Sequence, residues 1–125
     1  MKKIAIIGGG ISGLYFANLL QKNQNYSYTI FEKKTNFDLN DGYGIQLSVN
    51  SIKLLNEIGF SNIEASSVSF PKKVIFYDAR SSKKICDIEI SKFNDANSRY
   101  TTLKRSTLFN FLLDKVPNEK IIYNS

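Results

Sequence analysis

The feature that most constrains this chain is a glycine motif placed between a short strand-like run and an amphipathic stretch. Residues 3–7 are dominated by apolar residues that favour β structure, as is typical of a buried parallel strand. The motif Gly8-x-Gly10-x-x-Gly13 follows, and the apolar residues between positions 14 and 20 then recur at helical spacing. The order strand, glycine turn and helix is typical of the first half of a dinucleotide-binding βαβ unit.

The next predicted strand, Tyr26 to Phe31, is followed by the acidic residue Glu32, which lies 19 residues after Gly13. An acidic residue at about this separation accepts hydrogen bonds from the ribose hydroxyls of a dinucleotide. Its negative charge would repel a 2′-phosphate, so Glu32 disfavours NADP at this site. The alternative to a dinucleotide site is a glycine-rich turn with Glu32 as an ordinary surface carboxylate. That alternative does not explain why the strand, the glycine motif, the helix and the acidic residue follow one another at the spacing of a dinucleotide-binding unit.

Each position of the motif has a physical role. Gly8 allows the tight turn from strand to helix, Gly10 lets the backbone approach a pyrophosphate, and Gly13 allows the helix to pack closely on the strand. The amides of the first helical turn, around Ile11, Ser12 and Gly13, would point at the phosphates, aided by the helix dipole.

The rest of the chain alternates between strand and helix patterns. We predict a polar loop at residues 33–40, a strand at 42–47, a helix at 50–59 and a β-hairpin at 72–91. An extended segment at 99–103, a helix at 106–116 and a strand at 120–123 follow. Gly59 is expected to end the first of these helices and Pro117 the second. The βαβ unit would occupy residues 1–34, so the fold class is α/β with a parallel sheet interrupted by the hairpin.

Composition excludes several kinds of chemistry. The sequence contains no His, which excludes Ser-His-Asp triads, Cys-His pairs and His-ligated zinc. Its single cysteine, Cys86, rules out an internal disulfide and is predicted to be a packed or half-exposed thiol rather than a nucleophile. We predict neither a metal site nor a catalytic side chain.

Charge and hydropathy bear on the partners. The net charge is +6, from 17 basic and 11 acidic residues, and the lysines are scattered in pairs. This pattern favours a solvated surface over a nucleic-acid interface. No window approaches the roughly 20 apolar residues of a membrane span, and the amino-terminal apolar run stops at Gly8. The sequence therefore predicts a cytoplasmic protein with neither a nucleic-acid partner nor a transmembrane segment.

Two further blocks resemble one family. Residues 42–50, GYGIQLSVN, form the first block, and residues 99–112, RYTTLKRSTLFNFL, form the second. With the glycine motif, and in the same order, they resemble the FAD-dependent aromatic-ring monooxygenases, whose reference fold is that of para-hydroxybenzoate hydroxylase. The resemblance covers essentially all 125 residues.

The resemblance implies a Rossmann-like FAD/NAD(P)-binding domain, of which residues 1–125 would be the amino-terminal part. The remaining FAD and substrate domains would be absent. It also implies FAD as cofactor, NAD(P)H as reductant, dioxygen and a small organic molecule as substrates, and a homodimer as one form of the full-length enzyme. The parent protein would be a monooxygenase, and this fragment alone is expected to be inactive.

The same resemblance assigns individual residues. Gly8, Gly10, Gly13 and Glu32 would bind the ADP half of FAD. Arg105 would lie near the pyrophosphate and ribityl chain, where its positively charged fork suits phosphate oxygens. Lys33 would lie near the adenine, and Gly44 and Gln46 would run past the isoalloxazine. The alternatives are a solvated helix-end charge for Arg105, a surface lysine for Lys33, and an ordinary edge strand for Gly44 and Gln46.

Two features depart from the family. Its members carry a second Asp-Gly fingerprint and a later Gly-Asp fingerprint, whereas the only Asp-Gly pair here is Asp41-Gly42. Two other functions therefore stay open. One is a small stand-alone module that binds adenine dinucleotides, and the other is part of a different flavoprotein, such as a halogenase or a reductase.

Overall fold

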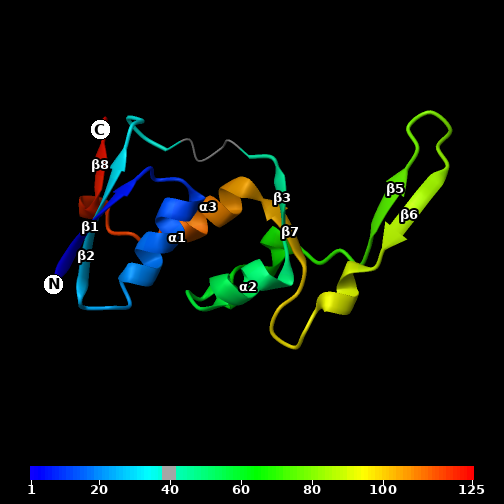
Figure 1. The fold of residues 1–125 in the computed structure, drawn as a ribbon, viewed down its shortest axis with the longest axis horizontal. Coiled ribbons are helices and arrows are strands. Elements are labelled where there is room, and N and C mark those ends of the chain that lie inside the picture. The colour runs from blue at the N-terminus through cyan, green and yellow to red at the C-terminus, as the bar shows by residue number, and fades with distance from the viewer. Residues whose placement is uncertain (38–41) are drawn as a thin grey trace. The chain divides into compact units, whose positions relative to one another are not determined.

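A computed structural model describes residues 1–37 and 42–125, and the chain divides into two compact units (Figure 1). Unit 1 comprises Met1–Tyr43 and Arg105–Ser125, and unit 2 comprises Gly44–Lys104. Residues 38–40 of the predicted polar loop, and Asp41 of the Asp-Gly pair, lie outside the described residues. Within the described part of the chain, every helix is too short or too polar to cross a bilayer.

Unit 1 contains a parallel sheet of three strands and two helices. These elements are β1 (Lys2–Ile7), α1 (Ile11–Leu20), β2 (Tyr26–Glu32), α3 (Arg105–Leu113) and β8 (Ile121–Tyr123). The strand order is β1-β2-β8, and β2 pairs in parallel with both neighbours. The parallel sheet that the sequence predicts is therefore confirmed.

The core of unit 1 lies between this sheet and the two helices, which pack against each other (Figure 1). Leu14 and Ala17 of α1, Leu112 of α3 and Ile30 of β2 are all fully buried. The amide group of Asn18 ties the helices together, because its Nδ2 donates to the carbonyl oxygens of Leu14, at 2.8 Å, and Leu112, at 3.0 Å. The helical spacing of the apolar residues in α1 thus predicts its buried face correctly.

The opposite face of the same sheet is open. Ile7 pairs with Phe31, and Phe31 pairs with Ile122, so the three side chains lie in one row on one face. Ile7 is 83% exposed and Ile122 is 46% exposed. Parallel sheets in folded proteins are usually covered on both faces. Among the described residues of unit 1, side chains cover only the face toward α1 and α3.

Unit 2 is built from antiparallel strands. Its sheet has the order β3-β7-β4, and a separate hairpin is formed by β5 and β6. The elements are β3 (Gly44–Leu47), α2 (Val49–Asn56), β4 (Val68–Ser69), β5 (Val74–Tyr77), β6 (Lys84–Ile88) and β7 (Thr101–Lys104), with short 3₁₀ turns at Phe60–Asn62, Ala65–Ser67 and Ile90–Phe93. Ile52 and Leu55 of α2 and Leu103 of β7 form part of its core.

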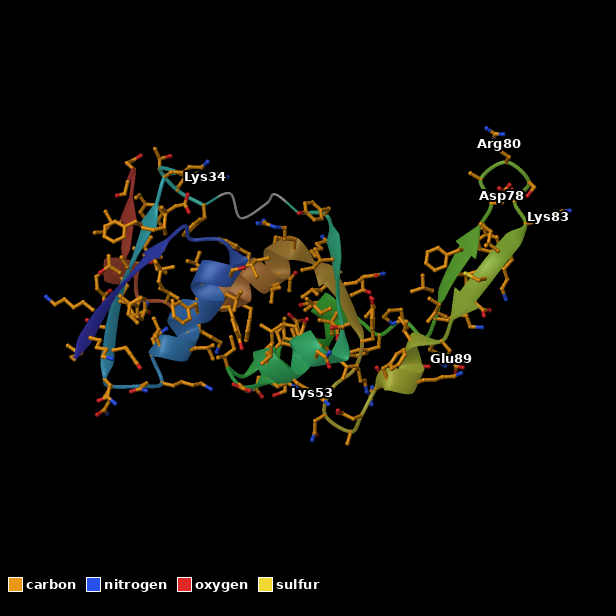
Figure 2. The ribbon with its side chains drawn as sticks, in the orientation of Figure 1. Lys34, Lys53, Asp78, Arg80, Lys83 and Glu89 are labelled. Atoms are coloured by element: carbon orange, nitrogen blue, oxygen red, sulfur yellow. The ribbon has the colours of Figure 1, made fainter. Side chains whose placement is uncertain are left out.

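The hairpin forms inside the predicted range 72–91, and its turn is held by Asp78 (Figure 2). Asp78 Oδ1 accepts hydrogen bonds from the backbone amides of Arg80, at 3.1 Å, and Ser81, at 2.6 Å. Every residue of β6 is exposed, including Cys86. Cys86 is therefore exposed and not packed, because the described residues cover neither face of this strand.

Two helix ends differ from the predicted boundaries. α2 ends at Asn56, and a turn leads to Gly59, whose left-handed φ of 87° confirms it as the stop. α3 ends at Leu113 instead of Val116. The amide of Val116 donates to the carbonyl of Leu113 in a tight turn, so the chain has left the α-helix before it reaches Pro117.

Candidate functional site

The glycine motif forms the turn between β1 and α1. Gly8 has a φ of 96°, a conformation that other residues rarely adopt. Its amide donates to the carbonyl of Phe31 at 2.8 Å, which joins the turn to β2. A Cβ added at Gly13 would lie 2.1 Å from the carbonyl oxygen of Gly8. Gly8 is thus required by its backbone conformation and Gly13 by close packing, as the sequence predicts.

Gly10 differs from the other two glycines of the motif. It precedes α1 with a φ of −75°, and a Cβ added there would meet nothing within 4 Å. Neither strain nor packing inside the protein therefore explains a glycine at this position. No side chain caps the amides of the first turn, which includes Ile11 and Ser12. Open space beside unfilled helical amides is the arrangement that binds an anion at a helix start.

Glu32, at the end of β2, is only 8% exposed and links the glycine turn to the following loop. Its Oε2 accepts a hydrogen bond from the amide of Gly9 at 2.7 Å, and its Oε1 accepts one from the amide of Lys34 at 3.0 Å. The bond from Lys34, supported by the one from Gly9, holds the pKa of Glu32 below its ordinary value, although burial acts in the opposite direction. The carboxylate is therefore charged at neutral pH, and each oxygen retains a lone pair for a further donor.

A cavity of about 160 Å³ lies beside Glu32 in unit 1 and brings the predicted residues Gly10, Glu32 and Arg105 together. Arg105 begins α3, and its Cζ lies 6.0 Å from the centre of the Phe109 ring. The Phe37 ring meets Phe109 edge-on, with a centroid distance of 5.0 Å. The cavity therefore combines a carboxylate, a guanidinium, a free helix start and two aromatic rings.

Lys33, Gly44 and Gln46 lie outside this cavity. Lys33 is exposed and contributes its charge to the surroundings of Glu32, while Lys34 is the lysine that lines the cavity (Figure 2). Gly44 and Gln46 belong to β3 of unit 2, where Gln46 Oε1 accepts a hydrogen bond from the Tyr100 hydroxyl at 3.2 Å. Their assignment to the adenine and the isoalloxazine stays a prediction.

Sequence reasoning misses four residues of the cavity, namely Gly9, Lys34, Phe37 and Phe109. Gly9 and Lys34 contribute their backbone amides to Glu32, and a main-chain contact has no residue-type signal. Phe37, in the segment after β2, and Phe109 of α3 meet only in the folded unit, and no local spacing relates them. Only the acidic residue and the glycines have a fixed spacing that a sequence pattern can detect.

Comparison with known proteins begins with residues 6–37, which match the model of the NAD(P)-binding Rossmann-like domain. This segment includes the glycine motif, Glu32 and Phe37, and it spans the end of β1, all of α1 and all of β2. A search of the curated proteins finds no match to the chain. The sequence-level match therefore concerns the βαβ unit.

Solved structures resemble nearly the whole chain. One is 2,6-dihydroxypyridine-3-hydroxylase from Arthrobacter nicotinovorans, at 19% identity and a TM-score of 0.72, covering 98% of this chain and 28% of that one. Another is HpxO from Klebsiella pneumoniae, complexed with FAD and uric acid, at 20% identity and a TM-score of 0.76, covering 98% and 30%. A third is a putative FAD containing monooxygenase from Photorhabdus luminescens subsp. laumondii, at 21% identity and a TM-score of 0.72, covering 99% and 31%.

These likenesses establish the fold. The chain has a Rossmann-like fold shared with 2,6-dihydroxypyridine-3-hydroxylase, with HpxO and with the putative FAD containing monooxygenase, and it spans less than a third of each of the three solved chains.

Proposed function

We propose that this chain is the FAD-binding part of a flavin-dependent monooxygenase, which uses NAD(P)H and dioxygen to oxygenate a small organic substrate. The observation that carries the proposal is the buried Glu32 carboxylate, which is bonded to the amides of Gly9 and Lys34 and shares one cavity with Gly10 and Arg105. The fold shared with FAD-containing monooxygenases favours FAD over other adenine dinucleotides.

The residues of the cavity fit the adenosine and phosphate part of FAD. Glu32 accepts hydrogen bonds from the ribose hydroxyls through the lone pairs that its backbone contacts leave free. The open space at Gly10 admits the pyrophosphate to the first-turn amides of α1. Arg105 binds a phosphate oxygen pair with its planar fork. When bound, FAD supplies the redox chemistry of the enzyme.

Selectivity between cofactors follows from the charge of Glu32. Because its pKa is lowered, the carboxylate stays ionised at neutral pH and repels a 2′-phosphate placed at the same ribose. The site therefore takes FAD or NAD in preference to NADP. NAD(P)H as reductant would bind elsewhere in the full-length enzyme.

Titration of FAD into the purified chain tests the site. Glu32→Gln keeps the shape of the side chain and removes its charge, so we expect FAD binding to weaken by about 1–3 kcal/mol. The matched control is Glu64→Gln, which neutralises an exposed carboxylate of unit 2. Equal FAD affinities for the wild-type chain and Glu32→Gln would remove Glu32 from the site.

A competing function is a stand-alone module for adenine dinucleotides, which the match of residues 6–37 to an NAD(P)-binding model favours. Titrations of ADP, NAD and FAD separate the two. Clearly tighter binding of FAD supports the monooxygenase, and equal affinities support the module.

Residues 1–125 alone are expected to bind FAD weakly and not to oxidise NAD(P)H, because they span less than a third of the solved enzymes. Steady NAD(P)H oxidation by this chain would contradict that expectation. For the full-length enzyme, we propose a cytoplasmic location and a homodimer.

A further inference from the structure

The hairpin of β5 and β6 exposes apolar side chains that the proposed nucleotide site does not use (Figure 1). Among the described residues, the two strands pair only with each other. Phe76 is 47% exposed, Ile88 is 49% exposed and Ile75 is 39% exposed. A two-stranded hairpin alone is marginally stable in water, so burial of these side chains against an apolar partner would stabilise it.

The strand pairing gives this hairpin two unlike faces. Side chains of paired residues point to the same face, and alternate residues of one strand share that face. One face carries no charged side chain and comprises two cross-strand pairs, Val74 with Ile88 and Phe76 with Cys86. We call it the uncharged face. On the opposite face Ile75 pairs with Asp87, which forms an ion pair with Lys84. Only the uncharged face can therefore be buried against an apolar surface without removing a charge from water.

Positive charge is concentrated in and around the hairpin. Residues 72–92 contain six basic and three acidic side chains, and the difference is half of the chain's net charge of +6. The acidic side chains are already engaged, because Asp87 and Glu89 form ion pairs with lysines and Asp78 accepts the turn amides. In the part of the chain that the structure describes, no ion pair involves the other basic residues, which are Lys72, Lys73, Arg80 and Lys83. Arg80 and Lys83 lie at the tip of the hairpin (Figure 2), which therefore offers unpaired positive charge to a partner.

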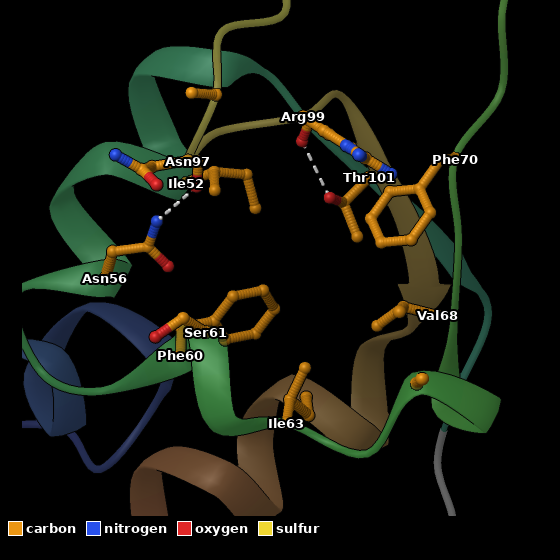
Figure 3. A pocket seen from close by; sticks show the side chains of 12 residues that line it. Ile52, Asn56, Phe60, Ser61, Ile63, Val68, Phe70, Asn97, Arg99 and Thr101 are labelled. Carbon is orange, nitrogen blue, oxygen red and sulfur yellow. Dashed lines mark hydrogen bonds between the residues drawn. The ribbon is translucent and has the colours of Figure 1, made fainter.

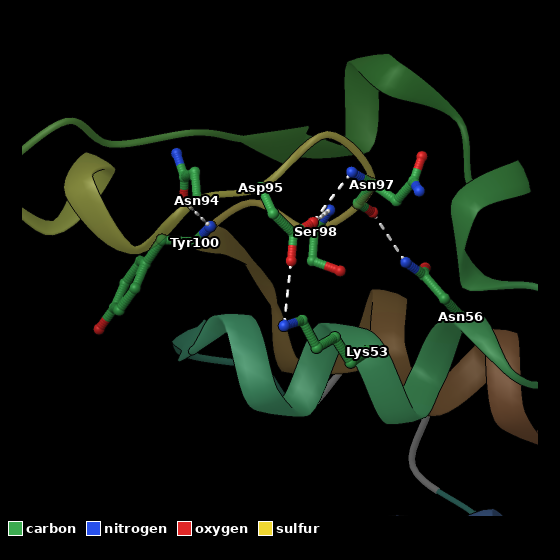
Figure 4. Close-up of polar contacts among 7 residues, drawn as sticks. All are labelled: Lys53, Asn56, Asn94, Asp95, Asn97, Ser98 and Tyr100. Atoms are coloured by element: carbon green, nitrogen blue, oxygen red, sulfur yellow. Dashed lines mark hydrogen bonds and ion pairs between the residues drawn. The ribbon is translucent and has the colours of Figure 1, made fainter.

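The segments on both sides of the hairpin are held to the rest of unit 2. Before β5, the ring centre of Phe70 lies 5.4 Å from Arg99 Cζ, and both residues line a cavity of about 270 Å³ (Figure 3). After β6, Asp95 Oδ2 pairs with Lys53 Nζ of α2 at 3.0 Å (Figure 4). Both ends of the hairpin are thus anchored, so less ordering is needed when a partner binds.

Charge and hydropathy together define the partner. A second copy of this chain would bring two positively charged hairpins together, so their charge opposes self-association. A nucleic acid complements the charge, but its bases stack on aromatic rings, and aliphatic side chains such as Ile88 gain little from it. An anionic lipid surface complements both features, because its headgroups attract basic side chains and its acyl region accepts apolar ones. We propose that this hairpin docks on an anionic lipid bilayer, with the uncharged face against the lipid and Arg80 and Lys83 at the headgroups.

The hairpin would lie in the interface and not cross the bilayer. The outer edges of β5 and β6 pair with no other strand among the described residues, so their backbone groups need water or headgroup partners. The proposal goes beyond the nucleotide-binding function and requires no residue of unit 1.

Co-sedimentation of the complete chain with lipid vesicles tests the proposal. One set of vesicles contains phosphatidylcholine and phosphatidylserine, and the other contains phosphatidylcholine alone. We expect the chain to bind the anionic vesicles roughly tenfold or more tightly than the neutral ones, and the binding to weaken as salt is added. Equal binding to both sets, or binding to neither, would overturn the proposal.

Two isoleucines on opposite faces assign the contact. Ile88→Ser removes an apolar side chain from the uncharged face, and we expect it to weaken binding to anionic vesicles roughly threefold or more. Ile75→Ser makes the same change on the opposite face and should leave the binding unchanged. The chain contains no tryptophan, so Phe76→Trp supplies a single probe whose emission should shift to the blue on anionic vesicles. Equal losses for the two serine variants would contradict the assigned face.

A pair of charge variants tests the tip of the hairpin without altering its strands. Arg80→Gln combined with Lys83→Gln should weaken binding roughly fivefold or more. Lys2→Gln combined with Lys3→Gln removes the same charge from exposed positions of unit 1 and is the matched control. Circular dichroism of each variant reports whether the fold is intact. If Ile88→Ser does not fold, the comparison of the two double variants decides, and equal losses would refute the proposal.

Other occupants of the uncharged face would give different results. A dimer in sedimentation velocity that Ile88→Ser abolishes, without binding to vesicles, would assign this face to a second copy and overturn the proposal. Binding of a single-stranded oligonucleotide without binding to vesicles would overturn it as well. Glu32→Gln is expected to bind vesicles as the wild type does. A failure of the nucleotide site would therefore appear in the FAD titration, and a failure of the lipid surface in the co-sedimentation.

Discussion

Units 1 and 2 build their cavities by different means. In unit 1, the groups that face the cavity beside Glu32 include backbone amides, and their positions follow from one short turn at the end of a parallel strand. In unit 2, side chains from α2, β4 and the segment before β7 surround the cavity beside Arg99. The part of a cavity that is built on the main chain of one turn leaves a fixed spacing in the sequence, whereas the part built from side chains of distant segments does not.

The largest expected difference between the two units is the loss of stability caused by one methyl group added at Gly13. A Cβ there would lie 2.1 Å from the backbone oxygen of Gly8, which cannot move without distorting the turn. We expect Gly13→Ala to lower the free energy of unfolding by about 3 kcal/mol. The matched change in unit 2 is Gly44→Ala, where a Cβ meets nothing within 4 Å and little loss is expected.

Urea unfolding of both alanine variants measures the difference. Similar urea midpoints for Gly13→Ala and Gly44→Ala would mean that the glycine turn of unit 1 tolerates an added methyl group as well as β3 of unit 2 does.

Gly10→Ala separates folding from binding within the same motif. The added Cβ enters open space, so we expect the free energy of unfolding to change by less than about 1 kcal/mol. The methyl group would occupy the path of the pyrophosphate to the helix amides, so FAD affinity should fall roughly tenfold or more. Isothermal titration of FAD, with urea unfolding as the control, checks both parts. Retained affinity would contradict the assignment of Gly10.

Each unit contains an asparagine whose side chain donates a hydrogen bond to a backbone carbonyl of a distant segment, and the two differ in burial. Asn18 is buried and bonds the carbonyls of Leu14 and Leu112, while Asn56 is half-buried and bonds that of Asn97. We expect Asn18→Ala to cost about 1–3 kcal/mol of unfolding free energy, because it leaves a buried carbonyl without its donor. Asn56→Ala should cost about 0.5 kcal/mol, since water can replace its bond. Thermal melts rank the two, and the reverse order would refute the reasoning.

Acid sensitivity is the smallest expected difference. The lowered pKa of Glu32 means that the unfolded chain takes up a proton before the folded one does as pH falls. The ionised Glu32 carboxylate therefore stabilises the folded chain at pH values above about 4.3, the ordinary pKa of a glutamate side chain. This stabilisation is lost as the pH falls through the pKa of Glu32 in the folded chain. Glu32→Gln should flatten the dependence of the unfolding free energy on pH below about pH 5.

In unit 2, Asp78 and Asp95 also have lowered pKa values, from hydrogen bonds that Ser81 and Lys53 respectively donate, but Asp78 is only half-buried and Asp95 is exposed. Water and salt weaken such contacts, so Asp95→Asn should alter the same pH profile less than Glu32→Gln does. A larger effect of Asp95→Asn than of Glu32→Gln would show that burial of the carboxylate does not decide how strongly it affects the pH dependence of stability.

Sequence patterns predict β1, α1 and β2 within about a residue or two, because each has a strong local period and clear end signals. They miss β4, a strand of two residues whose only support is its pairing with β7, far along the chain. They place the end of α3 at Val116, because Pro117 is visible in the sequence and the tight turn that precedes it is not.

The residues of the two cavities differ in the same way in how far the sequence predicts them. The glycines, Glu32 and Arg105 can be named from spacing and resemblance, whereas Phe37 and Phe109 cannot, since their contact depends on the packing of unit 1. The cavity beside Arg99 has no sequence signal at all, because its apolar residues have the same pattern as any core.

The backbone contact at the limits of unit 2 has a consequence for engineering. The amide of Arg105 donates to the carbonyl of Tyr43 at 2.9 Å, so the chain returns to the point from which it departed. Closing a longer loop costs little extra entropy, about 0.6 kcal/mol for each doubling of its length. The segment Gly44–Lys104 can therefore be exchanged for a shorter or longer insert with only a small entropic cost to the closure that brings Arg105 back. Tyr43 and Arg105 mark a graft point at which new domains can be spliced into a Rossmann scaffold.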